Sequence, residues 1–393
     1  MANYNFFITL LLACSPSVFK SDEIYSLKSV SMAFRHGDRT PQAYPTGFYP
    51  NDPYINDSFE PYGHSALTNE GKKREYQIGE KLRERYNAFL GDTFKPSEIS
   101  VVSTSTERTK MSLLLVLAGL YPPKGKQVWK DELNWQPIPI DSIPYDLQSY
   151  MHPPKCPIYV NELKRVKNST EYKKDLSRFN ELMKNLTVFT GREIDDIKIV
   201  YHLYHTLTAE SSLGLALPEW TKLYFPNGLI RNATLFEYKT ESYTPKLIRL
   251  NGGTFIRKIM NDLIFEKRLN STKLNLYSAH EDNIAGLLYA LGAWKNEIPA
   301  YGSGIVFELH ERNSKNYIRI LHYMGVPAEF KLHRIPGCAE FCAIEDFMSI
   351  LKDVIPDDVM VTCFGPPESS LLIPKGSNPI IWLYEKIKSW FNL

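Results

Sequence analysis

Three short apolar runs along the chain are each followed by a polar segment and then by an apolar or amphipathic stretch. Short apolar runs bounded in this way are typical of buried strands, and the stretches after them have helical spacing. The strands are predicted at residues 27–34, 99–103 and 273–278, and the helices that follow them at residues 68–90, 111–120 and 284–291. In the first helix, Thr68 is the expected N-cap, and Ile78, Leu82, Tyr86 and Phe89 recur at helical spacing.

Repeated strand–turn–helix units predict an α/β fold with a mostly parallel central sheet flanked by helices. Two later strands are expected at residues 304–309 and 317–321. Residues 124–253 alternate charged helical stretches with proline-rich loops, and we interpret them as an inserted, smaller and mainly helical cap. The alternative that some of this segment completes the main domain stays open. The expected organisation is a signal peptide at 1–17 and one domain at 18–393, with its α/β core at about 24–123 and 254–393.

The polar segment after the first strand is the most informative part of the chain. It reads Arg35, His36, Gly37, Asp38, Arg39, Thr40, Pro41. Buried arginines are costly unless an anion neutralises them, and the planar guanidinium matches phosphate oxygens bidentately. A histidine between two such arginines is a candidate nucleophile, because phosphate binding alone does not need an imidazole. The segment therefore predicts a phosphate site with an attacking histidine.

The polar segments after the other two strands supply further groups of this kind. Arg108 follows the second strand, and His280 and Glu281 follow the third. Because the carboxyl ends of strands in an open α/β sheet line one crevice, we expect these side chains to converge. The candidate site residues are Arg35, His36, Arg39, Arg108, His280 and Glu281.

Phosphoryl transfer needs cationic groups around the phosphate, a nucleophile in line with the leaving group, and an acid beside the ester oxygen. The three arginines and His280 are expected to bind the phosphate. We expect His36 to attack as a neutral imidazole, whose pKa the arginines lower, and to form a phosphohistidine. Glu281 is the candidate proton donor, and Asp38 is a conceivable substitute.

Charge and length exclude several classes of partner. The formal net charge is +2 over 393 residues and the charges are interspersed, which argues against a nucleic-acid binder. No apolar run after the N-terminal segment could cross a membrane, and residues 379–391 are interpreted as a terminal helix packed on the body. The expected partner is a small-molecule phosphomonoester or a phosphoprotein. A homodimer stays open, because no interface can be identified.

Metal-dependent hydrolysis is the alternative mechanism. His202 and His205 have the spacing of a ligand pair on one helical face. The Asp and Asn-His clusters typical of metallophosphatases are absent, however, so we interpret the two histidines as packing residues. No metal and no other cofactor is expected.

The N-terminus and the cysteines predict export from the cytoplasm. Residues 6–14 form a short apolar segment followed by small residues, which is typical of a secretory signal peptide cleaved near residue 17. Beyond it the chain keeps an even number of cysteines, as a disulfide framework requires: Cys156, Cys338, Cys342 and Cys363. Five Asn-x-Ser/Thr acceptors are present, at Asn56, Asn168, Asn185, Asn232 and Asn270. We expect a secreted glycoprotein, with the lysosomal lumen less favoured.

The ordered set of motifs resembles the histidine acid phosphatases, the branch-two histidine phosphatase superfamily that includes prostatic, lysosomal and insect venom acid phosphatases. The resemblance rests on residues 35–41, 67–71, 103–109, 217–220, 277–281 and 337–342. It implies an α/β core with a mostly helical cap, no metal, and hydrolysis of varied phosphomonoesters at acid pH. It also implies that His36 is the nucleophile and that the three arginines and His280 hold the phosphate.

The resemblance bears on two points that the residues alone leave open. The four cysteines allow three pairings, and the family pattern implies Cys156–Cys363 and Cys338–Cys342. Mammalian members have His-Asp where this chain has His280 and Glu281, which puts the carboxylate on a longer arm. The alternatives are therefore a weakly active or inactive phosphate-binding protein of the same fold, or a phytase or lysophosphatidate-type phosphatase. The mixed charges of the cap favour a general phosphomonoesterase over a phytase.

Overall fold

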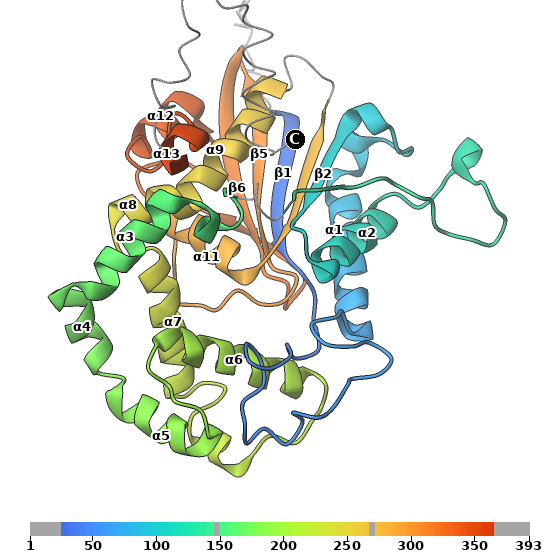
Figure 1. Cartoon of the computed structure of the whole chain (residues 1–393). Helices are drawn as coiled ribbons and strands as arrows, with labels where there is room; N and C mark the ends of the chain where they lie inside the picture. The colour runs from blue at the N-terminus through green and yellow to red at the C-terminus, as the bar shows by residue number, and fades with distance from the viewer. Residues whose placement is uncertain (1–24, 145–148, 267–271, 365–393) are drawn as a thin grey trace, which may run out of the picture.

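The computed structural model describes residues 25–144, 149–266 and 272–364, which are built on one central sheet (Figure 1). The strands follow the order β3-β2-β4-β1-β5-β6-β7, with β8 beside β6. They are β1 (Ser26–Arg35), β2 (Ile99–Ser103), β3 (Asp141–Ser142), β4 (Leu274–Ala279), β5 (Gly304–Arg312), β6 (Lys315–Tyr323), β7 (Phe330–His333) and β8 (Cys342–Ala343).

Helices cover both faces of this sheet and form the lobe at one end of it (Figure 1). They are α1 (Asn69–Leu90), α2 (Glu107–Leu120), α3 (Pro157–Asn168), α4 (Thr170–Ser177), α5 (Asn180–Thr190), α6 (Ile197–Ser212), α7 (Leu229–Glu241), α8 (Pro245–Ile248), α9 (Thr254–Asn261), α11 (Glu281–Ala290), α12 (Ile344–Ile350) and α13 (Val359–Phe364).

Strand β1 is buried on both faces from Ser29 on, and its residues from there to Phe34 are apolar or small. Met32 and Phe34 pack on the side covered by α1 and α2. Ala33 points to the opposite side, which α9, α11 and α12 cover. The alternation follows from the two-residue period of a strand, and it places the end of β1 between two helical layers.

The sheet is parallel in the half that the first three predicted strands form. β1 pairs with β4, β4 with β2, and β2 with β3, all in parallel. The two later strands are also found, and they run antiparallel: β5 pairs with β1 and β6 with β5. The expected α/β fold is therefore present, with its polar strand ends in the parallel half.

Two helices begin earlier than the apolar pattern predicts. α2 starts at Glu107 and α11 at Glu281, several residues before the apolar stretches at 111 and 284. Both first turns are acidic, and a carboxylate there interacts favourably with the positive end of the helix dipole. Apolar periodicity alone does not detect such polar first turns.

Helices α3 to α7 form a lobe at the carboxyl end of the parallel strands (Figure 1). They share an apolar core of their own, which includes Tyr159, Leu186, Ile197 and Phe236. β3 lies within the interval that we expected to be the cap, yet it joins the central sheet. Part of residues 124–253 therefore completes the main domain.

The cysteines pair as the family resemblance implies. Cys156, at the start of α3, bonds to Cys363 of α13, and Cys338 bonds to Cys342. Among the sequons, Asn56, Asn168 and Asn232 are exposed and Asn185 is half-buried. The predicted signal peptide, Asn270 and the predicted terminal helix at 379–391 lie outside the described residues. Within the described ranges, no helix is both long and apolar enough to cross a bilayer.

Candidate active site

The ends of three neighbouring strands bring the predicted site residues together. Arg35 is the last residue of β1 and stands opposite Ala279, the last residue of β4. His280 and Glu281 follow at the start of α11, while Arg108 lies in the first turn of α2, just after β2. Parallel pairing aligns the carboxyl ends of these strands, so side chains that are far apart in sequence meet in one place.

The first turn of α1 holds the loop after β1. The backbone N–H and the hydroxyl of Thr68 both donate to the carbonyl oxygen of Asp38, at 3.0 and 3.3 Å. A Cβ at Gly71 would lie only 2.1 Å from that oxygen. The carboxylate of Asp38 accepts from Arg74 Nε at 2.6 Å. The motif at 67–71 therefore fixes the backbone on which His36 and Arg39 stand.

Arg35 is 2% exposed and is held on several sides. Its Nη1 donates to the carbonyl oxygen of Pro299 at 2.6 Å, and its Nε lies 3.2 Å from Oε2 of Glu281. The ring centroid of Tyr301 lies 4.0 Å from the guanidinium carbon, within cation–π distance. Such a guanidinium is preorganised, because its position does not depend on a bound anion.

His36 is 1% exposed and has a defined tautomer. Its Nδ1 lies 2.8 Å from the carbonyl oxygen of Gly37. A carbonyl can only accept, so Nδ1 carries the proton and Nε2 carries the lone pair. Burial and the charges of Arg108 and Arg35 hold the pKa of His36 well below its ordinary value, with a further contribution from His280. The imidazole is therefore neutral and nucleophilic even in acid.

Arg108, a cation, and His280, whose pKa burial and Arg108 lower to about 3, lie side by side in the site. Arg108 Nη2 lies 3.4 Å from Nδ1 of His280, whose Nε2 lies 3.0 Å from the hydroxyl of Thr104. Burial and the neighbouring Arg39 lower the pKa of Arg108 to about 10, so this guanidinium stays charged in acid. The guanidiniums of Arg39 and Arg108 repel each other, and this repulsion favours the binding of an anion between them.

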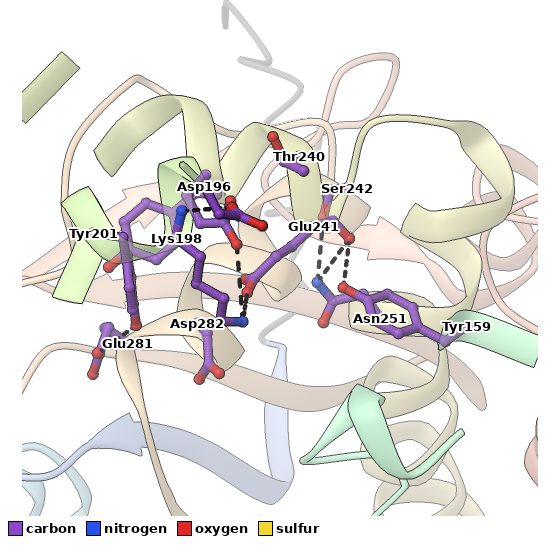
Figure 2. A network of polar contacts seen from close by, with 12 residues as sticks. Tyr159, Asp196, Lys198, Tyr201, Thr240, Glu241, Ser242, Asn251, Glu281 and Asp282 are labelled. Atoms are coloured by element: carbon purple, nitrogen blue, oxygen red, sulfur yellow. Dashed lines mark hydrogen bonds and ion pairs between the residues drawn. The ribbon is translucent and has the colours of Figure 1, made fainter. Parts of the chain in front are cut away.

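Glu281 is 8% exposed and faces both the core and the cap. Its Oε2 lies beside Arg35, and its Oε1 accepts a hydrogen bond of 2.8 Å from the hydroxyl of Tyr201 (Figure 2). Nε2 of His205 lies 3.7 Å from Oε1. Burial opposes ionisation, but the neighbouring positive charge of Arg35 holds the pKa of Glu281 well below the usual range. With Arg35 beside it, Glu281 is a carboxylate.

A cavity of about 250 Å³ is lined by four of these residues, Arg39, Arg108, His280 and Glu281. Residues of α6 and α7 line it on the cap side, and Asp282 lines it on the core side. The arrangement can bind a small dianion against a neutral imidazole, beside a carboxyl group.

A family model of the histidine phosphatase superfamily (branch 2) matches residues 26–323. The chain belongs to this superfamily. It is 40% identical to a venom acid phosphatase of Apis mellifera over 340 residues, which cover 86% of this chain and 87% of that protein. It is 30% identical to a lysosomal acid phosphatase of Homo sapiens over 379 residues, covering 93% and 88% of the two chains.

Solved structures at low sequence identity share the histidine phosphatase fold. A phytase of Hafnia alvei in complex with myo-inositol hexakis sulphate superposes with a TM-score of 0.63 at 16% identity, covering 86% of this chain and 98% of that one. A phytase of Citrobacter braakii gives a TM-score of 0.61 at 16% identity, covering 84% and 98%. At such identities the likeness is one of fold.

The structure of this histidine phosphatase places all six predicted site residues at one cluster, and it also shows where the other candidates lie. The carboxylate of Asp38, the conceivable substitute for the proton donor, accepts hydrogen bonds from Arg74. The ring of His205 packs on Tyr201, and its Nε2 lies 3.1 Å from the hydroxyl of Tyr238. In the described part of the chain, no three His, Cys, Asp or Glu side chains gather to hold a metal ion.

Tyr201 and Tyr301 contact the predicted site residues but are not among the residues that the sequence predicts. Tyr201 lies 80 positions before the carboxylate it contacts. Tyr301 stands in a loop after α11. Twenty-four tyrosines in the chain give no local signal that separates these two from tyrosines of the core.

Proposed function

We propose that this protein hydrolyses phosphate monoesters at acid pH through a phosphohistidine on His36. The observation that carries the proposal is a buried imidazole with its lone pair on Nε2, surrounded by arginine side chains. Arg35, Arg39, Arg108 and His280 are the proposed phosphate ligands, and Glu281 is the proposed proton donor. Membership of a phosphatase superfamily and the names of its acid phosphatase relatives support this assignment.

The reaction follows from the positions of these groups. His36 Nε2 attacks phosphorus, and the electron pair of the breaking P–O bond goes to the ester oxygen, which takes a proton from Glu281. The products of this step are the alcohol and the phosphohistidine. Water then attacks phosphorus and gives its proton to Glu281, which releases inorganic phosphate and restores neutral His36. The arginines stabilise the charge on the equatorial oxygens in both steps.

Binding of the phosphate allows Glu281 to take up from solvent the proton that it then donates. The phosphate takes up the charge of Arg35, which is the nearest cation to the carboxylate. Burial then dominates and raises the pKa of Glu281. Low pH favours the protonated acid, while His36 stays neutral because its own pKa is low. The two shifts together account for an acid working range.

The part of the cavity beside α6 and α7 favours small monoesters over highly phosphorylated substrates. The cation that α6 contributes is Lys198, whose Nζ lies 3.4 Å from Glu241 (Figure 2). The same Nζ lies 3.8 Å from Glu237. Asp282, whose pKa burial and Glu241 raise to about 7, adds no positive charge. A substrate with several phosphates would need unpaired cations in this region.

We propose that the protein is secreted. Two disulfides are stable in an oxidising compartment. Three of the sequons are exposed and open to glycosylation. The relatives include venom and lysosomal enzymes, and both locations require entry into the secretory pathway.

The test is the hydrolysis of p-nitrophenyl phosphate from about pH 3 to 8 with EDTA present. We expect turnover in the acid range for the wild type and a loss of about three orders of magnitude or more in His36→Ala. The matched control is His333→Ala, which removes an imidazole from the edge strand β7. A rapid quench should trap phosphate on His36.

Three other outcomes would contradict the proposed function. Phosphate trapped on a different residue would refute His36 as the nucleophile. Inhibition by EDTA that a divalent metal reverses would contradict the mechanism. Absence of turnover, with inorganic phosphate still raising the unfolding temperature, would identify a phosphate-binding protein instead.

A further inference from the structure

Glu281, the proposed proton donor, contacts residues of both the cap and the core. Its two oxygens have different neighbours: Oε1 accepts from the hydroxyl of Tyr201 at 2.8 Å, and Oε2 lies 3.2 Å from Nε of Arg35. Figure 2 shows Tyr201 and Glu281 directed toward each other from α6 and α11. The carboxyl group therefore bridges the two lobes, with Oε1 in contact with the cap and Oε2 in contact with the core.

This asymmetry decides where a proton on Glu281 can reside. Burial and the neighbouring charge of Glu281 raise the pKa of Tyr201 far above its ordinary value, so its hydroxyl keeps its proton and donates it. An oxygen that accepts from Tyr201 in this buried place is the unfavourable one to protonate, since two hydrogens would then meet. Nε of Arg35 lies 3.2 Å from Oε2 but makes no hydrogen bond to it, so the proton of the neutral acid is left to Oε2.

We propose that Tyr201 is a positioning residue that reserves Oε2 of Glu281 for the catalytic proton and so aims this proton at the phosphate held by Arg35. The inference rests on the proposed function and goes beyond it, because it assigns to the cap a part in leaving-group protonation. In the first step the O–H bond at Oε2 breaks as the proton moves to the ester oxygen. In the second step Oε2 receives the proton of the attacking water.

His205 supports this position of Tyr201. The ring centroids of the two side chains lie 4.6 Å apart with the rings nearly perpendicular, and Nε2 of His205 lies 3.1 Å from the hydroxyl of Tyr238. Burial lowers the pKa of His205 to about 3, so above that pH its imidazole is a neutral ring that packs against Tyr201. The titratable and charged groups facing Glu281 are Arg35 and His36 at the end of β1, Arg108 of α2, Tyr201, His202 and His205 of α6, Tyr238 of α7, and His280 and Asp282 beside it.

The decisive variant is Tyr201→Phe, which removes only the hydroxyl. Tyr204→Phe is the matched control, because it removes a hydroxyl from the same helix and its ring packs on Phe225, 5.4 Å away between centroids. The two substrates are p-nitrophenyl phosphate, whose leaving group needs little protonation, and ethyl phosphate, whose leaving group needs it fully. We expect kcat for ethyl phosphate to fall by about 10- to 100-fold, a part of the usual contribution of a general acid, and kcat for the nitrophenyl ester to change by less than about threefold.

The pH profile gives a second readout that a structural role would not move. A hydrogen bond from Tyr201 stabilises the charged form of Glu281 and so lowers its pKa. Without the hydroxyl this pKa rises, and the basic limb of the kcat profile should shift to higher pH in Tyr201→Phe but not in Tyr204→Phe. Glu281→Asp, whose shorter arm withdraws from Tyr201, should lose turnover of ethyl phosphate far more than turnover of the nitrophenyl ester.

Equal losses for the two substrates, no loss for either, or an unmoved basic limb would overturn the inference. Failure of the proposed function has a different signature, in which the wild type hydrolyses neither ester or His36→Ala keeps its turnover; that result removes both claims. Both outcomes are read from the same set of purified full-length variants.

Discussion

Replacement of Glu308 by Gln should lower the stability of the protein by roughly 3 kcal/mol at neutral pH and by almost nothing near pH 2. Glu308 lies on β5, is 2% exposed, and receives hydrogen bonds from Arg85 and Tyr86 on Oε1 at 2.9 and 2.7 Å. His310 Nε2 lies 3.0 Å from Oε2. The side chain is remote from the active site, so its effect on stability can be measured without one on catalysis.

The magnitude follows from the pKa of this carboxyl. Burial alone would raise it, but the contacts with His310, Arg85 and Tyr86 lower it from 4.5 to about 2. Each pKa unit between folded and unfolded states corresponds to about 1.4 kcal/mol. Because the folded pKa is depressed, the stabilisation is fully present above the unfolded pKa and is lost as the pH falls from about 4.5 toward 2.

The assay is urea unfolding followed by tryptophan fluorescence at pH 7, 5, 3.5 and 2.5. Glu311→Gln is the control on the same strand, since its ion pair with Lys28 is exposed and should contribute less than about 0.5 kcal/mol. A difference between wild type and Glu308→Gln that is the same at pH 7 and pH 2.5 would refute the reasoning, because the ionised form of Glu308 would then not be its source.

Three further results are expected. Inorganic phosphate at about 100 times its dissociation constant should stabilise the wild type by about 2.7 kcal/mol in thermal unfolding, and Arg108→Gln should lose most of this effect. Gly71→Ala should destabilise by about 1–3 kcal/mol and reduce turnover, since its Cβ would meet the carbonyl oxygen of Asp38 at 2.1 Å; chemical unfolding and kcat measure both. Loss of the Cys156–Cys363 bond, which spans 207 residues, should cost up to about 5 kcal/mol, against about 2 for Cys338–Cys342, which spans 4; equal losses would contradict the loop-entropy argument.

The parallel half of the sheet could be predicted from the sequence because its strands are short runs rich in apolar residues and bounded by polar ones. Residues 27–34 and 273–278 stand out for this reason, and polar residues at their ends mark the crevice. The antiparallel direction of β5 could not be predicted in the same way. It depends on pairing with β1 across 270 to 285 positions, and an apolar run has no direction of its own.

The clustering of the proposed catalytic groups could be predicted because each is an unusual residue near a strand end, whereas their supports are common residues that act through tertiary contact. The residue types of Arg35 and His36 already indicate phosphate binding and nucleophilic attack. Tyr301 matters only because its ring lies 4.0 Å from the guanidinium carbon of Arg35, and Tyr201 only because its hydroxyl reaches Glu281. Neither contact leaves a periodic or compositional trace.

The longer carboxylate of this chain has a structural consequence that a His-Asp pair would lack. An aspartate at position 281 would end about one C–C bond earlier and could not meet Arg35 and Tyr201 with separate oxygens in the present backbone position. With glutamate, the carboxylate contacts both the end of β1 and α6 of the cap. A displacement of α6 therefore changes the hydrogen bond on Oε1 and with it the pKa of Glu281, the proposed proton donor. Esters with poor leaving groups should consequently be sensitive to substitutions that loosen the cap, while activated esters report only on the arginines and His36.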